Sequence, residues 1–429
     1  MTDHSLAFTL LFSALLMLGL LTRFYLASRQ IRHVALHRDQ VPAAFASTIT
    51  LASHQKAADY TIAKARFGML EMAFAAAVLL GWTLLGGIDI LNQALLHSAL
   101  PSYGSLAPQL ALLAIFGLVS GLLDLPFTLY STFRLEERFG FNKMTLRLWL
   151  ADLVKSTALG IVIGLPIVAL ILWLMGSAGK GWWLWAWAVW MAFNLLVLVL
   201  FPTVIAPLFN KFKPLDDEVL KARVTALMQR CGFAAKGLFV MDGSKRSAHA
   251  NAYFTGFGAA KRVVFYDTLL RQLSPAEVDA VLAHELGHFK HKHIIKRIGV
   301  MFAISLAGFA LLGWLSSQVW FYTGLGVQPN VTGANDALAL LLFLLVTPLF
   351  SFFVSPLMAQ FSRKHEFEAD AYAMAQTDGR DLQSALLKLY QDNASTLTPD
   401  PVFVKFYYSH PPASERLRRM TPSVESAAS

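Results

Sequence analysis

The sequence predicts an all-α, polytopic membrane protein with about seven transmembrane helices and a small α+β domain on the cytoplasmic side. Its 429 residues are 56% hydrophobic and only 15% charged, with a mean hydropathy of +0.51, whereas soluble proteins carry about 25% charged residues. Seven apolar segments are long enough to cross about 30 Å of hydrocarbon, which takes about 20 helical residues each. These segments lie near Leu6–Leu26, Phe67–Gly87, Leu106–Leu129, Leu153–Met175, Trp182–Pro207, Ile298–Tyr322 and Ala337–Met358.

This pattern divides the chain into four parts. Residues 1–207 form an N-terminal membrane domain with five transmembrane helices, and residues 208–297 form the first long polar segment. Residues 298–358 form a transmembrane hairpin, and residues 359–429 form a second polar segment. Because a hairpin returns the chain to the side of the membrane that it left, we expect the two polar segments to meet and to form one domain.

Basic residues are concentrated in the connections after the first and third spans, whereas Ile88–Ser105 and Thr323–Asp336 contain no Lys or Arg. The positive-inside rule therefore places the N-terminus outside, and both polar segments and the C-terminus in the cytoplasm. This topology and contact with anionic lipid explain the net charge of +9, so the charge does not indicate nucleic-acid binding. The connection Ala27–Arg66 is expected to be a helix on the membrane surface.

The most informative stretch is a His-Glu-x-x-His motif, in which His284 and His288 are four residues apart. Ser274-Pro-Ala-Glu277 precedes it as a capping box, which predicts that the motif lies on a helix. Residues four apart lie on one helical face, so the two imidazoles can bind one ion. A catalytic zinc has three protein ligands and an open position for water, and in this motif Glu285 is the general base. The alternative is a solvated helix whose histidines bind nothing.

A third ligand is expected near the end of the hairpin, where the helical stretch Ser362–Met374 is unusually acidic. Glu366 and Asp370 are four residues apart and share a face, whereas Glu368 points about 200° away. We therefore predict that Glu366 binds the metal ion and that Asp370 accepts the other N–H of a ligand histidine. His365 is an alternative ligand.

Two further histidines, His291 and His293, follow the motif beside Lys290, Lys292 and Lys296. We expect them to anchor the chain at the basic membrane surface rather than to bind metal.

The polar segment before the motif contains short β-like runs at Gly237–Met241, Ser247–Gly256 and Lys261–Asp267. A strand close to a peptidase centre can bind substrate by adding it as a further strand. Asn251 and Tyr253 are therefore candidate substrate contacts, although a sheet that only supports the helix would look the same. His410, in a loop near the C-terminus, could donate a hydrogen bond to an oxyanion, or could be an ordinary surface residue.

Several stretches together resemble the CAAX prenyl protease 1 family, which comprises integral-membrane zinc metallopeptidases of the sterile-24 type. They are His284–His288, Glu366–Asp370, Ser247–Tyr253, Tyr408–Pro411, Phe139–Asn142 and Pro207–Lys211, combined with the seven spans. The resemblance implies a barrel of seven helices around a large water-filled chamber, with the peptidase domain capping its cytoplasmic side. It also implies one Zn²⁺ ion bound by His284, His288 and Glu366, with Glu285 as the base.

The same resemblance implies roles for three other residues. Asp370 matches an aspartate that supports a metal ligand, Asn251 a substrate-binding strand, and His410 a histidine that stabilises the tetrahedral intermediate. The implied reaction removes the last three residues of a prenylated protein, so the expected partners are a peptide or protein substrate and membrane lipid. Residues 421–429 lack a dilysine-type retrieval signal, which favours a bacterial member of the family in the inner membrane.

Two other functions fit part of the sequence. One is a quality-control protease of the HtpX-like type that cleaves damaged membrane proteins. The other is a transporter or channel with a structural zinc site. A structural zinc normally has four protein ligands, and the sequence offers no obvious fourth ligand. Paired interrupted spans would indicate transport, and they are not evident either.

Overall fold

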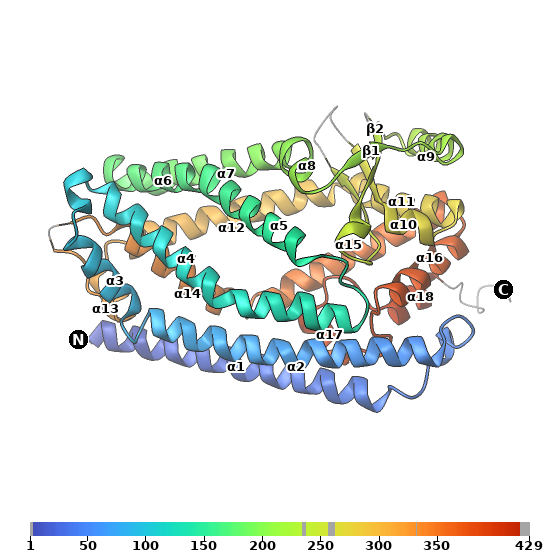
Figure 1. Cartoon of the computed structure of the whole chain (residues 1–429), viewed down its shortest axis with the longest axis horizontal. Helices are drawn as coiled ribbons and strands as arrows, with labels where there is room; N and C mark the ends of the chain where they lie inside the picture. Colours follow the sequence, from blue (N-terminus) through green and yellow to red (C-terminus); the bar gives the residue numbers. More distant parts are fainter. Residues whose placement is uncertain (1–2, 234–236, 256–261, 332, 421–429) are drawn as a thin grey trace, which may run out of the picture.

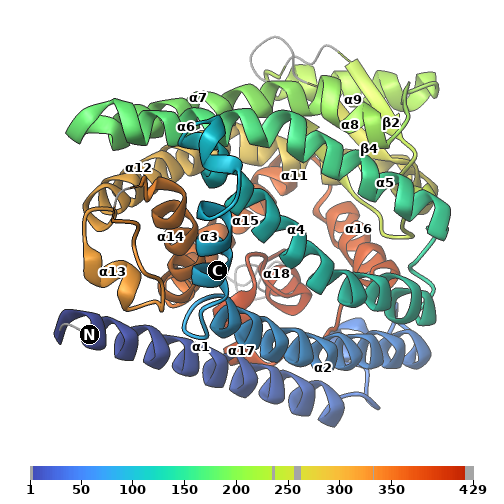
Figure 2. The same cartoon turned by 60° about the vertical axis from the view of Figure 1, so that its left-hand side comes forward.

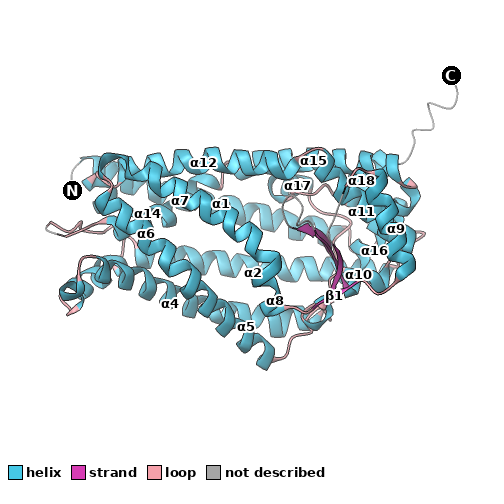
Figure 3. Ribbon diagram, turned by 90° about the horizontal axis from the view of Figure 1, so that it is seen from above, coloured by secondary structure: helices cyan, strands magenta, loops and turns pink. Residues whose placement is uncertain are grey.

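The long helices run side by side along the length of the molecule, and the strands are confined to one end (Figures 1 and 3). This computed structural model describes residues 3–233, 237–255, 262–331 and 333–420. Six continuous helical segments are long and apolar enough to span a membrane. They are Asp3–Leu36 (α1), Leu51–Trp82 (α2), Leu106–Glu136 (α4 and a π-helical turn), Leu146–Ser177 (α5 and α6), Gly179–Phe209 (α7 and α8) and His293–Leu315 (α12).

The seventh predicted span is broken into two helices. α14 (Asp336–Ser351) and α15 (Ser355–Gln376) are bent by 65° relative to each other, and together they pass the same test of length and composition. The acidic stretch predicted at Ser362–Met374 is therefore the continuation of this segment, inside α15. Figure 2 shows the membrane helices as a ring, viewed from the end that carries α3 (Gly87–Leu96) and α13 (Val319–Thr323).

The connection Ala27–Arg66 is mostly helical, as predicted, but its helical residues belong to two membrane helices. α1 continues without a break to Leu36, and α2 already begins at Leu51, where the Thr50 hydroxyl accepts a hydrogen bond from the Ser53 N–H. At 1.5 Å per residue both helices are about 50 Å long, well beyond the hydrocarbon thickness. The polar residues of this connection thus extend two membrane helices, which pack against each other.

The peptidase end contains a four-stranded sheet in the order β1-β2-β4-β3. β1 (Phe212–Pro214) pairs antiparallel with β2 (Gly237–Met241), β2 pairs parallel with β4 (Arg262–Tyr266), and β3 (Ala252–Thr255) pairs antiparallel with β4. The strand predicted at Gly237–Met241 is confirmed. The run predicted from Ser247 is a strand only from Ala252 onward, and its turn lies outside the described residues.

Short helices complete the peptidase part. They are α9 (Glu218–Arg230), α10 (Asp267–Gln272), α11 (Pro275–Lys290), α16 (Gly379–Asp392), α17 (Pro401–Tyr407) and α18 (Ala413–Met420). A hydrophobic core joins α9, α10, α11 and α16 to β4 and the inner face of α15. The second polar segment thus packs onto the first, as the predicted topology requires.

Candidate active site

The start of α11 is fixed by the predicted capping box. The Ser274 hydroxyl accepts from the Glu277 N–H, and the Glu277 carboxylate accepts from the Ser274 N–H at 2.7 Å. Burial alone would raise the pKa of Glu277, but hydrogen bonds from Lys388, Ser384 and Ser274 hold it below its usual value. These contacts tie the first turn of α11 to α16, so the motif helix has a defined position.

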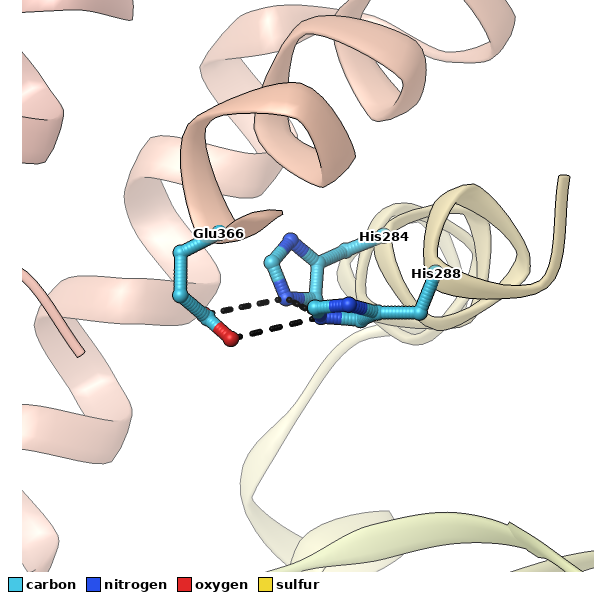
Figure 4. A group of neighbouring side chains, drawn as sticks. All are labelled: His284, His288 and Glu366. Atoms are coloured by element: carbon cyan, nitrogen blue, oxygen red, sulfur yellow. Dashed lines mark hydrogen bonds and ion pairs between the residues drawn. The ribbon is translucent and has the colours of Figure 1, made fainter. Parts of the chain in front are cut away.

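Figure 4 shows that His284, His288 and Glu366 point toward one another, the histidines from α11 and the glutamate from α15. The two Nε2 atoms are 3.3 Å apart, and the Glu366 oxygens lie 3.5 Å from His284 Nε2 and 3.3 Å from His288 Nε2. Ligand atoms about 2.1 Å from a tetrahedral zinc ion are about 3.4 Å from one another. Moreover, Glu366 Oε2 is buried and accepts no hydrogen bond from any residue that the structure describes, so the group fits a metal ion.

α11 and α15 can approach this closely because residue 287 of the motif is glycine. A Cβ atom there would lie 2.9 Å from the Ala369 Cα and 3.1 Å from its carbonyl oxygen. Such distances require backbone movement, so a larger residue would separate the two helices that carry the ligand atoms. Gly287 is therefore a fourth residue of His-Glu-Leu-Gly-His that the site requires, besides the two histidines and the glutamate.

Asp370, the predicted hydrogen-bond partner of a ligand histidine, lies beside His284. Its Oδ1 lies 2.8 Å from His284 Nδ1, so it can accept the N–H of a ring whose Nε2 faces the ligand group. Burial alone would lower the pKa of His284, but the Asp370 and Glu366 carboxylates outweigh this and raise it to about 9. These carboxylates therefore stabilise positive charge at the imidazole, whether proton or metal ion.

Arg416, on α18, is a further residue of the site that the sequence does not predict. Its Nε donates to Asp370 Oδ2 at 2.8 Å, and its NH2 group donates to the other oxygen of the same carboxylate. Asp370 is 3% exposed and Arg416 6% exposed, so the pair is withdrawn from water. One arginine in the run Glu415-Arg416-Leu417 carries no sequence signal for this role; only the fold brings α18 against α15.

Glu285 follows His284 on α11 and is half-buried. Its carboxylate makes no hydrogen bond or ion pair with any residue that the structure describes. His410 also reaches the site, with its Nε2 3.4 Å from Glu366 Oε1 and its Nδ1 3.0 Å from the Ser409 hydroxyl. Its side chain is 66% exposed and lines a pocket of about 610 Å³ together with Tyr60, His249 and Tyr408.

The two candidate substrate contacts lie on or beside β3, which is an edge strand of the sheet and contacts α11. Asn251 precedes β3, is exposed, and accepts a hydrogen bond from the Ala252 N–H through its own side chain. Tyr253 packs edge-on against Tyr266, and burial raises its pKa to about 12. Ala252 and Phe254 face the core beside α11, so Tyr253 lies on the opposite face of the sheet.

The two histidines that follow the motif differ: His291 is exposed, as expected for a surface residue, whereas His293 is not. His293 is only 4% exposed, so the prediction that it anchors the chain at the membrane surface is wrong. The alternative ligand His365 is not part of the three-residue group. Its ring instead stacks on that of His293, with 3.9 Å between the ring centroids.

Both halves of the chain match known protein families. Residues 30–211 match the family model of the CAAX prenyl protease N-terminal region, with five membrane helices, and residues 214–423 match peptidase family M48. The chain is 35% identical to the CAAX prenyl protease 1 homolog of Arabidopsis thaliana, an alignment that covers 92% of this chain and 93% of that protein. It is 36% identical to CAAX prenyl protease 1 of Saccharomyces cerevisiae, with 92% and 90% covered.

Solved structures give the same result. The crystal structure of S. mikatae Ste24p superposes with a TM-score of 0.89 at 31% sequence identity, covering 96% of this chain and 99% of that one. The similarity therefore includes the membrane helices and the peptidase part in one arrangement. The chain belongs to the CAAX prenyl protease 1 family, and it is a multi-pass membrane metallopeptidase of family M48.

Proposed function

We propose that the protein is a zinc endopeptidase that removes the C-terminal tripeptide from prenylated proteins. The observation that carries this proposal is the group His284, His288 and Glu366, which offers three ligand atoms to one ion. Three protein ligands leave a position for water, as catalytic zinc requires. Among the described residues, none adds the fourth ligand that a structural zinc needs.

The ion that suits these ligands is zinc. Two imidazole nitrogens and a carboxylate oxygen form a ligand set that zinc accepts readily, in the tetrahedral geometry that the distances fit. When bound, zinc polarises the substrate carbonyl and lowers the pKa of a bound water toward about 7. Asp370 keeps the His284 ring oriented, and the two hydrogen bonds from Arg416 keep Asp370 a carboxylate.

The proton transfers are assigned to Glu285. It takes a proton from the attacking water and gives it to the amine that leaves. Its half-buried carboxylate, without a partner among the described residues, is available for both steps. His410 donates from Nε2 to the oxyanion that forms on the former carbonyl oxygen. If the Ser409 hydroxyl, 3.0 Å away, donates to Nδ1, the ring carries a proton on Nε2, the nitrogen that faces Glu366.

The substrate binds as an added strand along β3, through backbone hydrogen bonds that require no particular sequence. Asn251 lies at the start of this edge and is proposed to contact the substrate; for Tyr253, the contact would come from the outer face of the sheet. The prenylated C-terminus is inferred from the relatives, which are named CAAX prenyl protease 1. The pocket beside His410, which Tyr60 and Tyr408 line, is proposed to hold residues next to the cleaved bond.

The proposed orientation places the active site in the cytoplasm and the N-terminus outside. Its support is the concentration of Lys and Arg in the connections after the first and third spans. The peptidase end of the structure lies at the same end of the helices as these connections (Figure 1). Location in a bacterial inner membrane stays a prediction, and residues 421–429, on which it depends, lie outside the described part of the chain.

The test uses the purified full-length protein in detergent with a farnesylated CAAX peptide and its unprenylated twin. We expect mass spectrometry to detect loss of three C-terminal residues from the farnesylated peptide, and a Glu366→Ala variant to lose both zinc and activity. Equal cleavage of the two peptides would contradict the prenyl specificity and favour a quality-control protease. Cleavage of neither, with zinc still bound, would favour a structural metal site in a transporter.

A further inference from the structure

The two histidines of the metal site differ in what supports them. His284 Nδ1 lies 2.8 Å from a carboxylate oxygen of Asp370. His288 Nδ1 instead lies 3.0 Å from the Nδ1 atom of another histidine, His293. His293 in turn places its Nε2 2.8 Å from Glu368 Oε2. A hydrogen-bonded chain thus leads from His288 through a buried histidine to a carboxylate.

The backbone brings His293 to this place by an unusual turn. α11 ends at Lys290 and α12 begins at His293, and between them Lys292 has a φ of 56°, in the left-handed region. Non-glycine residues rarely adopt this conformation. This left-handed residue turns the chain so that the His293 side chain points back toward His288. The ring of His365 stacks on the His293 ring and holds it in its plane. The turn therefore places His293 within hydrogen-bonding distance of the His288 ring.

The direction of the hydrogen bonds follows from the metal site. If His288 binds the ion through Nε2, its neutral ring carries the proton on Nδ1, which must donate. His293 Nδ1 is then the acceptor, so the proton of His293 lies on Nε2 and is donated to Glu368. We propose that His293 and Glu368 are positioning residues, which hold the His288 imidazole in the orientation that binds the metal ion; this rests on the proposed role of His288 as a ligand.

The same residues could be mistaken for a second metal site. His291, His293 and Glu368 offer ligand atoms within 4.8 Å of one another. However, 2.8 Å between His293 Nε2 and Glu368 Oε2 is a hydrogen-bond distance, shorter than the roughly 3.4 Å between ligands of one tetrahedral ion. The ring of His291 lies nearly parallel to that of His293, with centroids 5.5 Å apart. The geometry points to a hydrogen-bonded chain.

The test measures zinc affinity and the rate of zinc transfer to a chelator, on the full-length protein in detergent. Loss of such a supporting partner typically weakens metal binding about 10- to 100-fold, and we expect this for His293→Leu. His293→Gln should restore much of the affinity, because an amide can accept from His288 and donate to Glu368 together. Glu368→Leu, at a partly exposed position, should weaken zinc binding less and tests the chain even if His293→Leu does not fold.

Two controls separate this role from simple packing and from a second metal site. His365→Phe keeps a stacked ring without the nitrogens and should leave zinc affinity unchanged, as should His291→Leu. Unchanged zinc affinity in both His293→Leu and Glu368→Leu would overturn the proposal and leave the three-ligand site intact. Two zinc ions per chain, with one lost in His291→Leu, would overturn it in favour of a second metal site. Full zinc retention in His284→Ala would instead contradict the proposed function itself.

Discussion

The membrane half and the peptidase half bury different kinds of polar residue. In the described parts of residues 1–211 and of the hairpin 298–358, which together make up the membrane half, the buried polar side chains include no Asp, Glu, Lys or Arg. They are Ser5, Gln30, His54, Thr83, Asn92 and Gln109. The peptidase half and the loops that support it bury six charged residues. They are Glu277, Arg363, Glu366, Asp370, Asp400 and Arg416.

This difference shows how each half obtains its geometry. The membrane half has an apolar core between α1, α4, α6, α7, α12 and α14, with neutral hydrogen bonds such as Gln109 to the Ala337 N–H at 2.9 Å. Apolar packing tolerates small displacements. A buried charge is costly unless its partner lies at the correct distance and angle. The charged pairs therefore specify the position of the ligand atoms, whereas the membrane helices provide the frame.

The largest effect on stability is expected from Arg416→Ala. It leaves the buried Asp370 carboxylate without its cation, which typically destabilises a protein by about 3–5 kcal/mol. The matched control is Arg380→Ala, since Arg380 pairs with Asp378 but its side chain is 88% exposed. Thermal unfolding in detergent should show a large decrease for Arg416→Ala and little change for Arg380→Ala. Equal decreases would mean that burial of an ion pair does not determine how much it stabilises the peptidase half.

A smaller effect is expected where α11 meets α15. Gly287→Ala inserts a methyl group 2.9 Å from the Ala369 Cα, and such overpacking typically costs about 1–3 kcal/mol. Because the helices also carry the ligand atoms, zinc affinity should fall with stability. Gly299→Ala on α12 is the control, because its Cβ would meet nothing within 4 Å. If Gly287→Ala binds zinc and unfolds like Gly299→Ala, the close approach of the two helices does not determine the site.

The smallest effect concerns the start of α11 and depends on pH. The folded pKa of Glu277 is held below its usual value, so its contribution to stability is complete above about pH 4.5 and is lost as the pH falls through the lowered pKa. Lys388→Met removes one donor, at a side chain that is 40% exposed, and should cost about 1 kcal/mol at neutral pH. The acid-induced decrease in melting temperature should then be smaller than in the wild type, because the folded pKa of Glu277 lies closer to its unfolded value. An unchanged acid profile would contradict the role of Lys388.

Much of the site follows from local patterns. The spacing of His284 and His288, the shared face of Glu366 and Asp370, and the capping box at Ser274 all depend on helical geometry. The structure brings the first four together as that spacing predicts. The number of membrane segments also follows from composition, because a span needs only enough consecutive apolar residues.

The features that the sequence does not predict depend on contacts between residues distant in sequence, or on a backbone conformation that is rare for the residue type. Arg416 pairs with a residue 46 positions away, and nothing local distinguishes it from the exposed arginines beside it. The burial of His293 depends on the left-handed conformation of Lys292, which sequence propensity does not predict for lysine. The 65° bend between α14 and α15 is different, because Pro356 in the first turn of α15 is a local signal for a helix boundary.

The central claim is that Glu285 performs the proton transfers at a zinc ion held by three other residues. The direct test compares the wild type with Glu285→Gln, each measured for bound zinc and for cleavage of a farnesylated CAAX peptide. We predict equal zinc content and a decrease in turnover of at least about 10²- to 10⁴-fold, the usual contribution of a general acid–base. Retained turnover in Glu285→Gln, with zinc in place, would contradict the account.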